Sequence, residues 1–327
     1  TRRRLPELAT WYETTCSELA LRPLTPTDGA LLLSQKGVKG TNEEMLALSQ
    51  AAKGHALTLA LLGSYIRQAY HGDIRSVDQA SLTELDEGDL TFDTMGRYER
   101  WLEAGLCKTE LAILRMIGLF ERPATPEALF ALRDPPIDGL TDCLVGLSIA
   151  DWNRAIDRLV EWNLIEEVAW EPPRLLGFGK DDADAFLRTK TLGDPRPAPV
   201  RLGFDGQAKA VDTHMLIRDY FGARLREQSQ VWRMAHGRMF DWIRTSDAIP
   251  YWPEGLNGIE PLYQAVSHGC EAGQAQLAFD DVYWPRIQRG ENYHVIRHVG
   301  CFGSEVSVLA RFFARPWSQL TDGLSDD

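Results

Sequence analysis

Cysteine, long apolar runs and excess positive charge are all scarce in this chain of 327 residues. Its five cysteines are scattered and form no CxxC pair, which favours reduced thiols over disulfides or a zinc cage. No stretch approaches the ~18 uninterrupted apolar residues of a membrane span, and no apolar run follows the basic start as it would in a signal peptide. These features predict a soluble, unexported protein of the cytoplasm that has no membrane partner.

Acidic side chains outnumber basic ones by 47 to 35, which gives a net charge of -12 at neutral pH. Binding to nucleic acid needs a surplus of Lys and Arg to neutralise phosphates, so a nucleic-acid partner is not expected. The composition is otherwise that of a globular protein with a sizeable core, and the length predicts about two to three domains.

Helix-capping patterns organise the first part of the chain. Thr25-Pro26 starts one helix, Thr41-Asn42-Glu43-Glu44 reads as a capping box, and Lys53-Gly54 is a stop signal before an apolar run over 57–66. These patterns predict a compact helical module that ends near residue 72. The periodicity then gives way to an acidic, glycine-containing stretch, which predicts a linker over 73–104.

The middle of the chain has the element order of a winged-helix domain over 105–228. Apolar periodicity resumes at Leu111, Thr125-Pro126 starts a second helix, and Asp151 is expected to cap a third. Strand-like segments follow at 165–170 and 200–204, before a helix near His214. The charged, proline-rich residues 171–199 are expected to form an insertion in the wing.

After residue 229 the pattern is helical again, and Gly273 separates two amphipathic stretches at 259–272 and 274–288. This predicts one hairpin of a tetratricopeptide-like (TPR-like) array over 229–327, which we expect to continue beyond Asp327 because a solenoid needs several repeats. The fold class predicted is therefore mainly α: a helical subdomain, a winged-helix domain with a small β wing, and α-helical TPR-like hairpins.

Segments that resemble known catalytic or metal-binding motifs lack residues that those motifs require. Gly177-Phe178-Gly179-Lys180 is no phosphate loop, because Arg174 and Asp181 occupy the positions of the required Gly and Ser or Thr. His294 and His298 have the spacing of zinc ligands, but Val295 replaces the general-base Glu of a metalloprotease. We predict no catalytic residue and no metal site from local sequence, although a triad of distant residues would leave no such pattern.

Two motifs nevertheless carry a family resemblance. Gly54-His55-Ala56-Leu57-Thr58-Leu59 resembles the GLPLAL segment of NB-ARC-type STAND nucleotide-binding proteins, and Thr213 to Tyr220 resembles their MHD segment. Thr1-Arg2 is similar to the end of their sensor-1 strand. The order of the motifs, with a winged-helix pattern between them and helical repeats after them, matches the family over nearly the whole chain.

The resemblance implies a nucleotide site. His214 would contact the β-phosphate of ADP and Gly54 would allow a turn near the adenine, beside His55, Ala56 and Leu57. Arg2 would sense the γ-phosphate, and residues 1–72 would be the edge of the nucleotide-binding domain plus its helical lid. Ala56 stands where the family has proline, and Met215 where it has Pro or Asp. Three simpler roles stay open: a helix-start cap for His214, a C-cap for Gly54 and a solvated charge for Arg2.

The function implied is that of the regulatory portion of an ATP/ADP-switched signalling ATPase, of a class that includes bacterial defence proteins. Walker A and Walker B motifs are expected upstream, so ADP or ATP with Mg²⁺ would bind the full-length protein, and no cofactor is expected to bind this chain tightly. We also expect no ATP hydrolysis by this chain alone. Its partners would be its own nucleotide-binding domain, a protein or small-ligand trigger on the repeats, and further copies in an activated homo-oligomer.

Two other functions are weighed against this one. A winged-helix DNA-binding regulator would use a recognition helix over 151–163, whose two arginines are outnumbered by three acids. A scaffold would use the aromatic tail, Tyr283-Trp284, Phe312-Phe313 and Trp317, as a protein interface; the same aromatics also suit the core of a helical stack.

Overall fold

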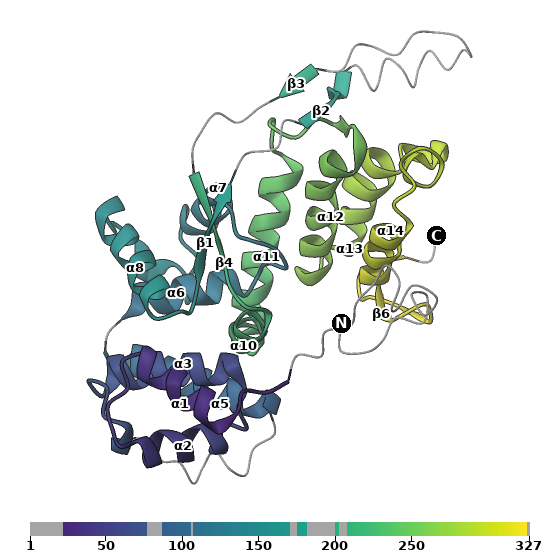
Figure 1. Ribbon diagram of the computed structural model, residues 1–327. Coiled ribbons are helices and arrows are strands. Elements are labelled where there is room, and N and C mark those ends of the chain that lie inside the picture. The colour runs from purple at the N-terminus through teal and green to yellow at the C-terminus, as the bar shows by residue number, and fades with distance from the viewer. Residues whose placement is uncertain are drawn as a thin grey trace, which may run out of the picture. The chain divides into compact units, whose positions relative to one another are not determined.

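The computed structural model describes residues 22–76, 87–105, 107–170, 175–181, 200–202 and 208–325. The described chain is mainly helical, with a few short antiparallel strands, which confirms the fold class at that level (Figure 1). It divides into two compact units, Thr1–Tyr98 and Glu99–Asp327, and the boundary falls within helix α5. None of the helices in these ranges combines the length and apolar character needed to cross a lipid bilayer.

The first unit is a small helical cluster built from capped helices. The elements are α1 (Pro26–Gln35), α2 (Asn42–Ala51), α3 (Ala56–Ala69), the 3₁₀ turn η2 (Ile74–Ser76) and the first part of α5 (Glu87–Ala104). Thr25 caps α1 by accepting a hydrogen bond from the Asp28 amide. Thr41 and Glu44 form the reciprocal capping box at the start of α2, as the sequence predicts.

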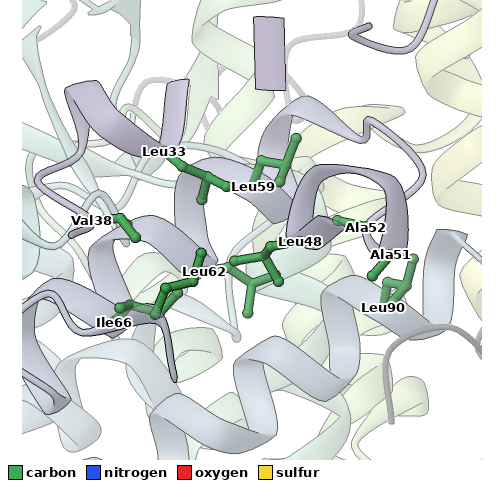
Figure 2. Close-up of a cluster of buried hydrophobic side chains, with 10 residues drawn as sticks. Leu33, Val38, Leu48, Ala51, Ala52, Leu59, Leu62, Ile66 and Leu90 are labelled. Carbon is green, nitrogen blue, oxygen red and sulfur yellow. The ribbon is translucent and has the colours of Figure 1, made fainter. Parts of the chain in front are cut away.

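One apolar core holds this unit together. Leu33, Leu48, Leu59, Leu62 and Ile66 are fully buried within it. Figure 2 shows that the side chains of α1, α2 and α3 converge there, and that Leu90 of α5 packs against them.

Helix α5 corrects a sequence prediction, because it occupies Glu87–Ala104 within the range assigned to a linker. Its buried residues Leu90, Met95, Tyr98 and Leu102 form an apolar stripe. Acidic residues at the start of the helix and polar residues between these positions obscured the stripe in the sequence.

The second unit begins with a group of short helices followed by a two-stranded ribbon. The ribbon, the helices before it and the helix after it are α6 (Lys108–Ile117), α7 (Pro126–Arg133), η3 (Asp142–Leu144), α8 (Ile149–Glu161), β1 (Glu166–Trp170), β4 (Ala208–Asp212) and α10 (Met215–Arg226). Ser148, rather than the predicted Asp151, caps α8. Asp151 lies in the first turn, where its negative charge interacts favourably with the positive end of the helix dipole.

The ribbon pairs β1 with β4 in antiparallel register, from Glu166 opposite Asp212 to Trp170 opposite Ala208. The sequence pattern predicts the second wing strand at 200–204. In the structure β3 (Val200–Leu202) pairs instead with β2 (Leu175–Phe178), and β2 also pairs with β5 (Trp252–Pro253). An isolated bridge between Ala124 and Val211 adds a third strand position to the ribbon, through amide–carbonyl hydrogen bonds of 2.8 and 2.9 Å.

The remainder of the second unit is helical except for a short C-terminal hairpin. Its elements are α11 (Ser229–Arg244), α12 (Gly255–Glu271), α13 (Ala275–Ala278), the π-helix η4 (Phe279–Ile287), η5 (Gly290–Asn292), the π-helix η6 (Val295–Val299), α14 (Phe302–Leu309), η7 (Ala310–Phe312), β6 (Phe313–Arg315) and β7 (Gln319–Leu320). Gly273 separates α12 from α13 with φ +78°, as predicted. The predicted helix over 274–288 is an α-helix only over its first turn and then continues as a π-helix.

A buried carboxylate ties the C-terminal helices to each other. The Glu305 side chain, on α14, accepts hydrogen bonds from Tyr263 (2.8 Å), Tyr283 and Gln288. These donors lie on or beside α12 and η4. A buried carboxylate needs such donors because burial removes its hydration, so this network fixes the position of α14 in the stack.

Candidate functional site

Gly54, the first of the predicted nucleotide-site residues, lies in the tight turn between α2 and α3. Its backbone has φ +65°, and its carbonyl accepts a hydrogen bond of 2.8 Å from the amide of Leu24. A Cβ atom at this position would lie 2.2 Å from the Leu24 carbonyl oxygen. The glycine is therefore required by the local packing, whatever else the turn contacts.

His55 is the N-cap of α3. Its Nδ1 accepts a hydrogen bond of 3.3 Å from the Thr58 amide and lies 2.7 Å from the Thr58 hydroxyl oxygen. The ring is half-buried. Ala56, which is exposed, and Leu57, which is half-buried, form the first turn of the helix.

His214 has the same local geometry in the second unit. It is exposed, follows β4 after one residue, and caps α10 by accepting a hydrogen bond of 3.2 Å from the Leu216 amide at Nδ1. The neighbouring Thr213 is buried and donates its hydroxyl to the Leu164 carbonyl at 2.5 Å, which anchors the end of the ribbon just before His214.

The two capping histidines share a chemical consequence. A neutral imidazole whose Nδ1 accepts a hydrogen bond carries its proton on Nε2, so Nε2 is the donor atom of both rings. Neither α3 nor α10 has an acidic residue in its first turn, so the positive end of each helix dipole is not offset there. Each ring is thus suited to donate a hydrogen bond to an anion.

The predicted site residues fall into separate groups. Gly54 through Leu57 are consecutive in the first unit, and His214 lies in the second. Arg2 lies outside the described residues, as does most of the predicted insertion 171–199. Gly177 belongs to β2, where a Cβ would lie 2.3 Å from the Trp252 carbonyl oxygen, so this glycine serves strand packing.

Sequence reasoning missed a large cavity in the second unit. Its volume is about 960 Å³, and five segments form its walls: the 118–123 loop, α10, α11, α12 and the α14–η7 segment. Two buried histidines, His236 of α11 and His268 of α12, line it, together with the aromatic side chains of Phe120, Trp232 and Tyr263.

The two histidines face each other. Their Nδ1 atoms are 2.8 Å apart, so one ring donates and the other accepts. Burial lowers the pKa of His236 to about 2, aided by the nearby His268, Arg226 and Arg311. Burial also lowers the pKa of His268 to about 4, with a further contribution from Arg311. Both rings are therefore neutral at physiological pH.

Ion pairs join the segments around this cavity. Arg226 of α10 pairs with Glu271 of α12 at 2.9 Å, and the Arg226 guanidinium lies over the Trp232 ring. Arg122 pairs with Glu260 at 2.8 Å, and Arg311 pairs with Glu121.

Comparison with known proteins adds no family to these observations, because neither a protein-family model nor a curated protein matches this sequence.

Within the described ranges, no three His, Cys, Asp or Glu side chains gather in a way that could hold a metal ion. His294 and His298 lie with their ring centroids 5.3 Å apart at the π-helix η6.

Proposed function

We propose that this chain is the regulatory portion of a signalling ATPase of the STAND class, in which it holds the ADP-bound closed state. The observation that carries the proposal is the geometry of His214. The ring is exposed at the start of α10, directly after the end of the β1–β4 ribbon, and its Nε2 is a hydrogen-bond donor. The family resemblance assigns a phosphate-contacting histidine to this position.

The arrangement around His214 supports a winged-helix domain. Three helices, α6, α7 and α8, precede the antiparallel β1–β4 ribbon, and the Ala124–Val211 bridge adds the segment between α6 and α7 to its edge. We propose that this ribbon is the wing and that α10 is the helix on which the latch histidine sits.

The first unit supports a helical lid. The turn at Gly54 brings the chain to the N-terminus of α3, where His55 and the uncompensated helix dipole favour an anion. We propose that α1, α2 and α3 cover a nucleotide that Walker motifs of the full-length protein would bind, together with Mg²⁺.

We further propose that α11 to α14 belong to a TPR-like sensor. A trigger bound there would favour the open state, release ADP and allow ATP-driven homo-oligomer formation. Such a population shift requires that the trigger bind the open state better than the closed one.

The charge of α8 does not favour the alternative of a DNA-binding regulator. Arg154 forms an ion pair with Asp151, and Arg158 forms one with Glu110. Both arginines are therefore already neutralised by carboxylates, whereas phosphate binding depends on a surplus of positive charge.

ADP retention by the full-length protein tests the proposed latch. We expect His214→Ala to reduce the molar ratio of ADP that copurifies with the protein and to weaken ADP affinity by about tenfold or more, the usual value of a hydrogen bond to a charged group. The ratio is measured by chromatography of the nucleotide released on denaturation, and the affinity by calorimetry.

His298→Ala is the matched control, because this exposed histidine lies on η6, outside both motifs. It should leave ADP retention unchanged. The latch is wrong if the wild-type protein holds no nucleotide, or if His214→Ala retains as much ADP as the control.

A further inference from the structure

The cavity in the second unit contains none of the residues assigned to the nucleotide site, so the proposed latch leaves it unexplained. Its volume of about 960 Å³ lies at the upper end of the range of small-molecule sites, which is roughly 300–1,000 Å³. It is also formed by segments far apart in the chain, as ligand sites between packed helices commonly are.

One part of the cavity wall is aromatic. Phe120 packs edge-on against the His268 ring, and the centroids of these two rings are 6.0 Å apart. The centroids of the Trp232 and His236 rings are 4.2 Å apart. Tyr263 also lines the cavity and is held in place by its hydrogen bond to Glu305. Rigid aromatic side chains of this kind favour a flat, unsaturated ring as the ligand.

The buried histidine pair supplies a polar group without a protein partner. His236 is 4% exposed, and among the described residues nothing hydrogen-bonds its Nε2. Leaving a buried polar atom unsatisfied is costly, and a ligand atom that reached Nε2 would remove that cost.

The charged groups that affect the histidine pair most are arginines. Arg226 and Arg311 act on His236, and Arg311 acts on His268. Carboxylates also line the cavity, and Glu271 is the one that pairs with Arg226. Glu271 accepts two hydrogen bonds from Arg226, of 3.0 and 2.9 Å, and a third of 3.0 Å from the Trp232 indole, whereas the Arg226 side chain remains 60% exposed. An incoming anion would therefore compete with Glu271 for Arg226, and removing the Glu271 charge should favour anion binding.

We propose that this cavity binds a small aromatic molecule that carries a carboxylate or phosphate group. Its ring lies against Trp232 and Phe120, and its anionic group pairs with Arg226, beside the His236–His268 pair. This inference does not depend on the proposed latch, and the chain can be tested for it in the absence of ADP and of the rest of the full-length protein.

Calorimetric titration of the chain with four probes tests the proposal. Indole-3-acetate and AMP combine a ring with a carboxylate or a phosphate, whereas indole and inorganic phosphate each supply one half. We expect at least one of the two aromatic anions to bind with a Kd on the order of 1 mM or tighter, and indole and phosphate to bind at least tenfold more weakly.

Variants with opposite expected effects locate the site. Arg226→Met should weaken binding of the better probe at least fivefold, and Glu271→Gln should tighten it severalfold because Arg226 loses its competing partner. Ser307→Trp, at an exposed position in the cavity wall, should block binding by filling the space. Ser229→Trp, at an exposed position outside the cavity, is its control.

The proposal is overturned if neither aromatic anion binds at about 10 mM, the weak limit of useful titration. It is also overturned if indole binds as tightly as indole-3-acetate, or if Ser307→Trp and Ser229→Trp leave binding equally intact. Circular dichroism of each variant confirms that the fold persists.

Discussion

At the scale of single residues, Gly54 shows how one backbone position determines the turn before α3. Lys53 and Gly54 are both left-handed, with φ +53° and +65°, and the chain reverses between α2 and α3 within these two residues. Lys53 adopts this conformation although it carries a side chain, and it is exposed. Gly54 is buried against Leu24 and leaves no room for a side chain.

We predict that Gly54→Ala destabilises the first unit by about 3 kcal/mol or more, because left-handed strain of roughly 1–3 kcal/mol adds to a backbone clash. Gly37→Ala is the matched control. It has the same sign of φ, but its Cβ would meet only the flexible Arg67 side chain, at 3.2 Å. Urea unfolding measures both, and equal losses would show that backbone strain alone determines the requirement for glycine.

Residue-level signals explain which local features were predictable from sequence. Thr25 and Thr41 follow common capping patterns, so the sequence locates both helix starts. His55 and His214 also cap helices, but histidine is not among the preferred capping residues, and the sequence left this role of His214 open.

At the scale of elements, the buried Glu99 joins the part of α5 that belongs to the second unit to α6 and α10. Its carboxylate accepts hydrogen bonds from Tyr220 (2.8 Å) and Arg224 (3.0 Å) of α10 and from Arg115 (3.0 Å) of α6. Burial raises the pKa of Glu99, but these three donors together outweigh burial, and the net pKa is below its usual value. The carboxylate therefore stays ionised at neutral pH and holds α5, α6 and α10 together.

We predict that Glu99→Gln destabilises the second unit by about 3 kcal/mol, because it removes the charge shared by two arginines at a buried position. Glu103→Gln is the control. Glu103 also binds Arg115, at 3.3 Å, but its side chain is 54% exposed, so its loss should cost at most about 1 kcal/mol. Thermal unfolding at pH 7 compares the two, and equal shifts in Tm would contradict a special role for the buried carboxylate.

Two elements were mispredicted for physical reasons that differ. Helix α5 was assigned to a linker, because its apolar stripe is interrupted by polar residues that its neighbours bury. The ribbon partner of β1 was placed at 200–204 instead of 208–212, because short strand-like segments look alike and pairing depends on long-range contacts. The helices with strong caps and clear periodicity were predicted correctly as helices.

At the scale of the whole molecule, the cavity illustrates what a single sequence hides. Helical periodicity on α11 and α12 indicates that His236 and His268 face the core, since both lie among buried apolar neighbours. It does not indicate that the two rings meet, because they are 32 positions apart on different helices. The position of Arg311, on a third segment, depends further on how α14 packs. Contacts of this kind follow from the assembled fold alone.

The histidine pair gives the second unit a defined pH dependence. In the unfolded chain both rings have a pKa of about 6.5, whereas in the folded chain the pKa of His236 is lowered to about 2 and that of His268 to about 4. Below pH 6.5 the unfolded chain therefore binds protons that the folded chain does not. This protonation stabilises the unfolded chain, so the free energy of unfolding decreases. Above pH 6.5 both states are neutral and the effect vanishes.

We therefore predict that the free energy of unfolding of the second unit falls between pH 6.5 and pH 5 by up to about 1.4 kcal/mol per pH unit for each buried histidine. The double variant His236→Leu, His268→Leu removes both groups, so its stability should change much less over this range. His298→Ala, which alters an exposed ring, should keep the wild-type slope. Urea unfolding at closely spaced pH values measures the three slopes. An unchanged slope in the double variant would mean that other groups cause the acid sensitivity, and that the two rings take up protons in the folded state despite their burial.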